Sequence, residues 1–159
     1  MPPEFAVRRV AVDGMSEPAG ATWSNCLVVG KEIVMSGITA RGGDGKPIGG
    51  LSMKGQTLEI FKRLAALTAA AGGGLQNVYK LIIYVTDMTL KDEVNLARRD
   101  IFRAVWPCST LVEVKGFAFE GFLVEVDAFA NLDVDMRAIA NAHQSNWLHS
   151  DHGTKNAGA

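Results

Sequence analysis

Hydrophobic and polar residues alternate most regularly near the end of the chain, between Ser109 and Asn131. The alternation predicts two β-strands, Ser109–Phe117 and Gly121–Asn131, joined as a hairpin by a short turn at Phe119–Gly121. In the second strand, one face carries only apolar residues: Phe122, Val124, Val126 and Ala128. The other face carries Leu123, Glu125, Asp127 and Phe129. Because a carboxylate among apolar neighbours needs a partner, a water-filled pocket or an interface, this second face predicts a polar site.

The rest of the chain shows strand and helix patterns in turn. Apolar and β-branched runs predict strands at residues 5–12, 26–29, 32–40 and 78–86, the second and third forming a hairpin. Helical spacing predicts one helix over residues 52–71, ended by three glycines, and another from a capping box at Thr89–Asp92 to the residue before Pro107. The order β-β-β-α-β-α-β-β predicts an α+β fold, with a single mixed β-sheet and two helices on one face.

That arrangement leaves the second face of the sheet without a covering layer. The face would carry Leu123, Phe129 and parts of Val34–Ile38, which is more apolar surface than monomers usually expose. A closed oligomer would cover it. The pattern alone does not distinguish a trimer from a dimer.

Composition narrows the functional classes. The 159 residues carry a formal net charge of −1 and no basic run, which argues against a nucleic-acid partner. No apolar run is long enough to cross a membrane, and the N-terminus lacks the apolar core of a signal peptide. Two cysteines are too few for a disulfide framework, so we expect a reduced, cytoplasmic setting.

The order and spacing of the motifs resemble those of the Rid family (RidA/YjgF, also called the endoribonuclease L-PSP family). The motifs are a strand ending in Ser36-Gly37, a helix from Gln56 to Ala71, a strand ending at Asp87, a helix from Asn95 to Pro107, and the final Val-Glu-Val-Asp-Ala strand. The resemblance covers about Phe5 to Leu132. It implies a chorismate-mutase-like fold and a homotrimer with a ligand pocket at each subunit interface, and no cofactor. We therefore divide the chain into a Rid-like domain, residues 1–132, and a C-terminal extension, residues 133–159.

The resemblance also implies a set of site residues. Glu125 matches the family glutamate that orients or activates water, Trp23 stands where the family often has tyrosine, and Ser36 and Gly37 match the pocket-lining pair. The family arginine that binds a substrate carboxylate is replaced by Ser109. Serine cannot reproduce the bidentate, always-charged guanidinium.

Arg41, at the start of a glycine-rich loop, and Lys115, on the predicted Ser109–Phe117 strand, are the candidate replacements for that cation, and either could instead be a solvated surface charge. Structural roles remain open for these residues. Glu125 could be bonded to the backbone or to Lys115, Asp127 could be a satisfied interface acid, and Ser109 could simply fill space.

Two functions follow. The first is hydrolysis, by deamination, of an imine, an enamine or a related small carbonyl compound at a subunit-interface pocket. The alternative is a non-catalytic protein of the same fold that binds or senses a small ligand, because the arginine is absent. RNA cleavage is disfavoured by the lack of a basic groove. All three histidines fall in the tail, which disfavours a Cys–His nucleophile, and we read the tail as disordered rather than as a metal site at His149 and His152.

Overall fold

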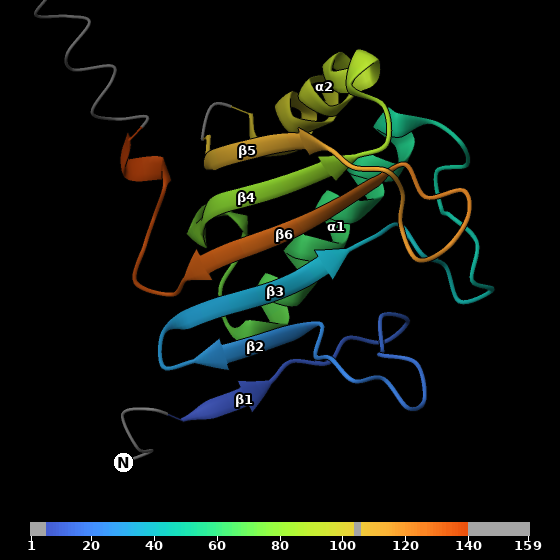
Figure 1. The fold of residues 1–159 in the computed structure, drawn as a ribbon. Coiled ribbons are helices and arrows are strands. Elements are labelled where there is room, and N and C mark those ends of the chain that lie inside the picture. Colours follow the sequence, from blue (N-terminus) through green and yellow to red (C-terminus); the bar gives the residue numbers. More distant parts are fainter. Residues whose placement is uncertain (1–5, 104–105, 140–159) are drawn as a thin grey trace, which may run out of the picture.

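The computed structural model describes residues 6–103 and 106–139 (Figure 1). Its elements follow the predicted order, with two short 3-10 helices added before β4 and α2. They are β1 (Val7–Arg9), β2 (Cys26–Val29), β3 (Glu32–Ile38), α1 (Met53–Ala71), η1 (Leu75–Asn77), β4 (Val78–Val85), η2 (Met88–Leu90), α2 (Lys91–Phe102), β5 (Cys108–Glu113) and β6 (Val124–Asn131).

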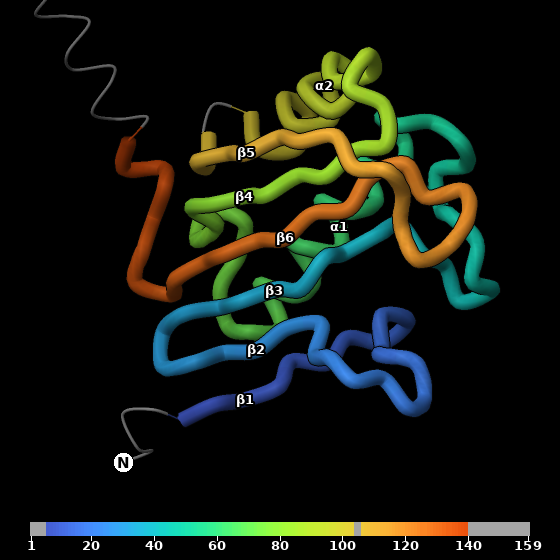
Figure 2. Tube along the Cα trace, in the orientation of Figure 1, coloured from blue at the N-terminus to red at the C-terminus, as the bar shows by residue number. Residues whose placement is uncertain are grey.

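The strands form one six-stranded sheet in the order β1-β2-β3-β6-β4-β5 (Figure 2). β4 and β5 are parallel, and the other neighbouring pairs are antiparallel. Helices α1 and α2 pack against each other and lie on the same face of the sheet (Figure 1). The predicted α+β fold, with one mixed sheet and two main helices, is confirmed.

The predicted hairpin between the last two strands is wrong. β5 pairs with β4 at the edge of the sheet, whereas β6 lies between β3 and β4 and is antiparallel to both. β5 also ends at Glu113, before the predicted Phe117. The turn near Gly121 exists, with φ of +87°, but it belongs to the long segment 114–123 that leads from the edge strand back to the centre of the sheet.

Local signals explain the bounds of the two helices. Ser52 accepts a hydrogen bond from the Gly55 N–H at 3.0 Å and begins α1, and Gly72, at φ +104°, ends it in the left-handed conformation. The capping box predicted at Thr89–Asp92 is not formed. Instead, the Asp87 carboxylate accepts a hydrogen bond from the Thr89 N–H at 2.9 Å and caps the 3-10 helix η2 rather than α2.

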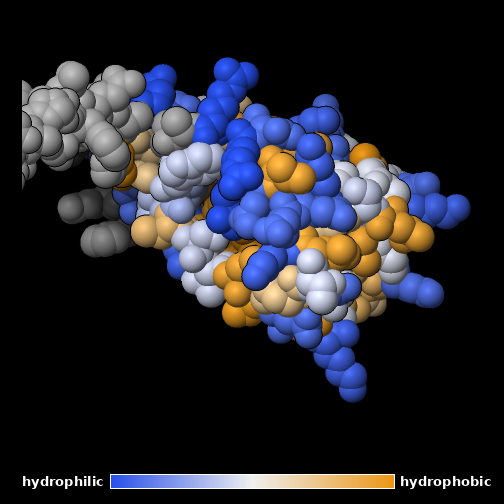
Figure 3. Space-filling view, turned by 90° about the horizontal axis from the view of Figure 1, so that it is seen from above, coloured by the Kyte–Doolittle hydropathy of each residue, from blue (hydrophilic) through white to orange (hydrophobic). Residues whose placement is uncertain are grey.

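The face of the sheet away from the helices keeps the predicted apolar character. β6 buries Val124, Val126, Ala128 and Ala130 against the helices and presents Glu125, Asp127 and Phe129 on the other face. Val34 and Val112 are among the exposed large apolar residues of the neighbouring strands. The view onto the β5–α2 edge shows hydrophobic patches among hydrophilic residues (Figure 3). Leu96, on α2, is one of the exposed large apolar residues.

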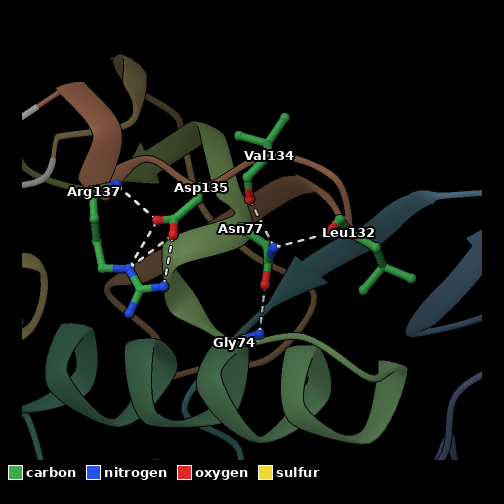
Figure 4. A network of polar contacts seen from close by, with 6 residues as sticks. All are labelled: Gly74, Asn77, Leu132, Val134, Asp135 and Arg137. Carbon is green, nitrogen blue, oxygen red and sulfur yellow. Dashed lines mark hydrogen bonds and ion pairs between the residues drawn. The ribbon is translucent and has the colours of Figure 1, made fainter.

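The segment after β6 folds back onto η1 through buried Asn77 (Figure 4). The Asn77 carboxamide accepts from the Gly74 N–H at 2.8 Å and donates to the Val134 carbonyl at 2.8 Å. The Met136 N–H donates to the Gln76 carbonyl at 2.8 Å, and the Met136 side chain is buried. A helical turn follows at residues 137–139. The tail predicted to be disordered, with its three histidines, lies outside the described residues from position 140 onward.

Candidate functional site

A cavity of about 650 Å³ lies at one end of the sheet. The segments 10–25, 39–52 and 114–123 gather there, beyond the ends of β3 and β5 and before β6 begins (Figures 1 and 2). Trp23, Ser36, Gly37, Arg41 and Glu125 all line this cavity. The structure therefore brings together five of the predicted site residues and leaves Ser109 apart from them.

A β-bulge in β3 shapes the floor of the cavity. Met35 pairs with Ala128 and Ile38 with Val126, so both Ser36 and Gly37 lie opposite Asp127. The Ser36 hydroxyl donates to the Ser24 carbonyl at 2.6 Å, and its N–H donates to the Asn25 carbonyl at 2.9 Å. The bulge thus ties the strand to the segment that carries Trp23.

Gly37 makes room for the Glu125 side chain. A Cβ atom added at Gly37 would lie 2.9 Å from Glu125 Cγ and closer still to its carboxylate. Gly37 does not have a positive φ, so space rather than backbone conformation requires glycine at this position.

We expect Gly37→Ala to push the Glu125 carboxylate out of its present position, because the added methyl group and the carboxylate cannot both be accommodated. A crystal structure of the variant would show the displaced side chain. Gly43→Ala is the matched control, since Gly43 lines the same cavity and an added Cβ would meet nothing within 4 Å. An unmoved Glu125 in Gly37→Ala would contradict this reading of the Ser-Gly pair.

Glu125 is half-buried, and no hydrogen bond or ion pair joins its carboxylate to Lys115 or to any other residue in the described part of the chain. Burial raises the pKa of Glu125, and the nearby Asp127 carboxylate raises it further. Asp127 accepts a hydrogen bond from the Tyr84 hydroxyl at 2.9 Å, and Tyr84 is the residue paired with Glu125 across β4 and β6. Asp127 is therefore hydrogen-bonded, whereas Glu125 is open to a ligand or water.

We expect Asp127→Asn to lower the pKa of Glu125, because the substitution removes the neighbouring negative charge but keeps the shape of the side chain. Titration of the Glu125 carboxyl carbon by NMR would measure the midpoint in both proteins. A raised pKa means that ionisation of Glu125 destabilises the fold. The stabilising contribution of the protonated carboxyl group is therefore lost as the pH rises from its pKa in the unfolded state to its higher pKa in the folded state. The slope of stability in that window should be shallower in Asp127→Asn. An unchanged midpoint would show that burial alone sets the pKa.

Trp23 is oriented by its own loop. Its indole N–H donates to Asn25 Oδ1 at 3.1 Å, and Asn25 Nδ2 donates to the Met15 carbonyl at 2.8 Å. The Asn25 N–H donates to the Glu17 carboxylate at 2.7 Å, and this bond is the largest cause of a lowered Glu17 pKa. Sequence reasoning missed Asn25; an asparagine before a strand is a common loop residue and gives no specific signal.

Two arginines line the cavity. The Arg41 guanidinium carbon lies 4.7 Å from the centroid of the Phe119 ring, a cation–π contact. None of the ion pairs found among the described residues includes Arg41. Arg63, on α1, instead pairs with Glu59 through a 3.1 Å Nε–Oε1 contact. Among residues 6–103 and 106–139, Arg41 is therefore the cavity arginine that no carboxylate pairs with.

Gln56 links two of the loops that wall the cavity, and sequence reasoning missed it. It is fully buried at the start of α1. Its Nε2 donates to the carbonyls of Gly50 and Gly121 at 2.7 and 2.8 Å, and its Oε1 accepts from the Leu123 N–H at 2.9 Å. The side chain thereby fixes the segment that leads into β6 and Glu125.

Ser109 lies on β5 on the side facing α2, where its hydroxyl accepts a hydrogen bond from Arg98 Nη2 at 3.1 Å. Arg98 Nε is buried and has no acceptor among the described residues, and burial lowers the pKa of Arg98. Within the described chain, this serine is not part of the cavity wall. Residues 6–103 and 106–139 also contain no group of three potential ligands arranged to hold a metal ion.

The architecture is that of a chorismate-mutase-like α+β protein with a polar cavity at one end of the sheet. The sequence profile described as Endoribonuclease L-PSP matches residues 14–132. The chain belongs to this family, also known as the Rid or YjgF family, and the resemblance seen in the sequence is confirmed. No curated protein matches the chain.

Solved structures agree with this assignment. A protein of unknown function from Pseudomonas aeruginosa is 40% identical, with a TM-score of 0.74, over 83% of this chain and 96% of that one. A YjgF/YER057c/UK114 family member from Mycobacterium tuberculosis is 27% identical, with a TM-score of 0.67, over 79% of this chain and 99% of that one. A Rid family protein of unknown function from Yersinia pestis shares the fold at 23% identity, with a TM-score of 0.72, over 79% of this chain and 99% of that one.

Proposed function

We propose that the protein hydrolyses a small imine or enamine, or a related carbonyl compound, in the cavity beside Glu125. The observation that carries the proposal is a half-buried carboxylate with a raised pKa and no partner in the described chain, in a cavity that Arg41 also lines. A pKa shifted toward neutrality suits a group that must both take and give a proton.

The chemistry needs one water molecule and one acid–base group. The Glu125 carboxylate takes a proton from water as the water oxygen attacks the carbon of the protonated imine, which gives a neutral carbinolamine. Glu125 then gives that proton to the nitrogen. As the carbon–nitrogen bond breaks, Glu125 takes the proton of the carbinolamine hydroxyl, and a carbonyl compound and an amine or ammonia are formed. The released amine or ammonia takes this proton from Glu125, which returns to the carboxylate. An enamine first gains a proton at carbon to become the imine.

The other cavity residues would bind and orient the substrate. Ser36 and Gly37 shape the floor under Glu125, Trp23 covers the ligand, and Arg41 holds an anionic group in place of the family arginine. We also propose a homotrimer, because apolar Val34, Val112 and Phe129 lie on the sheet face that no helix covers.

The test is the release of carbonyl product from imines that an amino-acid oxidase generates in the same solution. The expected result is a rate above spontaneous hydrolysis that increases with protein concentration and saturates with substrate. Thermal stabilisation by the same compounds without any acceleration, across a broad panel, would instead support a non-catalytic binding protein.

None of the helices in the described residues is long and apolar enough to span a bilayer. We place the activity in the cytoplasm as part of the proposal.

A further inference from the structure

Two aromatic rings that line the cavity are exposed to solvent. Trp23 is 48% exposed and Phe119 is 53% exposed, although both line the cavity. They come from different loops, 10–25 and 114–123. Exposed aromatic surface is unfavourable in water and favourable when it packs against another apolar or aromatic group.

Each ring has a contact within the protein that orients it. The Trp23 indole N–H is hydrogen-bonded to Asn25, and the Phe119 ring packs edge-on against Phe122, with centroids 6.4 Å apart and planes at 70°. Phe122 itself is buried. A rigid aromatic wall loses little conformational entropy when it binds a ligand, which favours a preformed site.

The cavity is also large for a very small acid. Its volume of about 650 Å³ lies in the range of roughly 300–1,000 Å³ that drug-sized ligands fill. A three-carbon acid would occupy a small part of it and would leave the rings in water. The aromatic lining and the size therefore favour a ligand with an apolar group of its own.

Charge supplies the second requirement. The Arg41 guanidinium lies over the face of the Phe119 ring. Among the described residues, no carboxylate pairs with it. A planar guanidinium of this kind binds a carboxylate through two parallel hydrogen bonds. The ring and the cation thus lie together on one wall.

We propose that the ligand of this cavity carries a carboxylate together with an aromatic or similarly large planar apolar group, bound by Arg41 and by the rings of Trp23 and Phe119. The inference rests on the proposed function only in taking an imine as the reacting group. It adds the substrate class: imines of acids with a bulky apolar side chain. Recognition of the ring and of the carboxylate can be measured without any turnover.

The test uses three stable probes at fixed ionic strength, with binding measured by calorimetry or by NMR titration. 3-Phenylpropanoate has both groups, propanoate lacks the ring, and 3-phenylpropanamide lacks the charge. We expect 3-phenylpropanoate to bind at least tenfold more tightly than either of the other two. Equal or weaker binding than propanoate would overturn the inference, and so would the absence of saturable binding.

Variants assign each part of the recognition. Arg41→Gln should weaken 3-phenylpropanoate at least tenfold and leave the amide unchanged, whereas Phe119→Ala should remove most of its advantage over propanoate. Arg99→Gln on α2 is the matched control for the charge change and should alter nothing. Unchanged affinity in Arg41→Gln would refute the carboxylate assignment.

The outcome separates this inference from the proposed hydrolysis. The Glu125→Gln protein should still bind 3-phenylpropanoate, since its ring and carboxylate contacts do not involve Glu125. Failure of all three probes to bind, together with hydrolysis of a small imine, would refute the ligand class and leave the hydrolase standing. Tighter binding of 3-phenylpropanoate than of the other two probes, without hydrolysis of any imine, would support the ligand class and refute the proposed hydrolase.

Discussion

Glu125→Gln is expected to lower kcat/KM for imine hydrolysis at least 100-fold. Glutamine keeps the size and polarity of the side chain but cannot accept a proton from water, and general acid–base catalysis typically contributes a factor of about 10²–10⁴. The measurement is carbonyl product released above the spontaneous rate. Residual turnover above a tenth of the wild-type value would remove Glu125 from the proton transfers.

The same variant should fold as well as the wild type or better. Above the raised pKa, the half-buried carboxylate is charged and its burial costs free energy, and the amide does not carry that charge. Loss of activity therefore could not be explained by unfolding, and thermal melting at neutral pH would verify this. Glu120→Gln is the control, because Glu120 is an exposed acid on the neighbouring segment that does not line the cavity, and its activity should stay within twofold.

Gln56→Met is expected to lower the free energy of unfolding by about 3–5 kcal/mol. Methionine nearly matches the length of glutamine, but it leaves the carbonyls of Gly50 and Gly121 and the N–H of Leu123 without their partner. Each buried polar group left unpaired costs about 1–3 kcal/mol. Urea unfolding with an unchanged slope would measure the difference.

Lys62→Met on the same helix is the matched control. Lys62 is exposed, so the same new side chain should change stability by no more than about 0.5 kcal/mol. A loss of less than about 1 kcal/mol in Gln56→Met would mean that water replaces the three bonds. The two loops would then not depend on this side chain for their position.

The sequence predicted the elements well because their signals are local. The helix Met53–Ala71 has a serine at its start, a glycine at its end and a buried stripe between them, and all three can be read from the residues. The alternation in Val124–Asn131 also assigned Glu125 and Asp127 to the correct face. Successive side chains of a strand point to opposite faces because of the backbone geometry alone, so this alternation is the same whichever strands lie beside it.

Strand neighbours could not be predicted in the same way. The run from Ser109 to Asn131 looks like a hairpin because a turn separates two alternating segments, yet β6 pairs with β3 and β4 instead. β6 is flanked on both sides, so long-range hydrogen bonds decide its place. Two alternating strands near a glycine do not reveal whether a third strand lies between them.

Family resemblance, rather than pattern, located most of the candidate site. Trp23, Ser36 and Glu125 are far apart along the chain, and the structure places them around one cavity. Gln56 was missed because a polar residue in a helix normally points to solvent, and only the loops folded over it make it buried. Arg98 was not connected with Ser109 because contacts between a helix and an edge strand depend on tertiary packing.

The position of β6 bears on how the protein is made. The last strand of the domain enters the middle of the sheet, where Glu32 of β3 meets Asn131 and Val85 of β4 meets Val124. Such distant pairings form slowly, because a long stretch of chain must be brought together first. During synthesis, the edges of β3 and β4 that flank β6 stay unpaired until the ribosome has released nearly the whole domain, and these edges are open to wrong associations in that interval. Because Glu125 lies on β6, the pocket is incomplete in any nascent chain that lacks this strand.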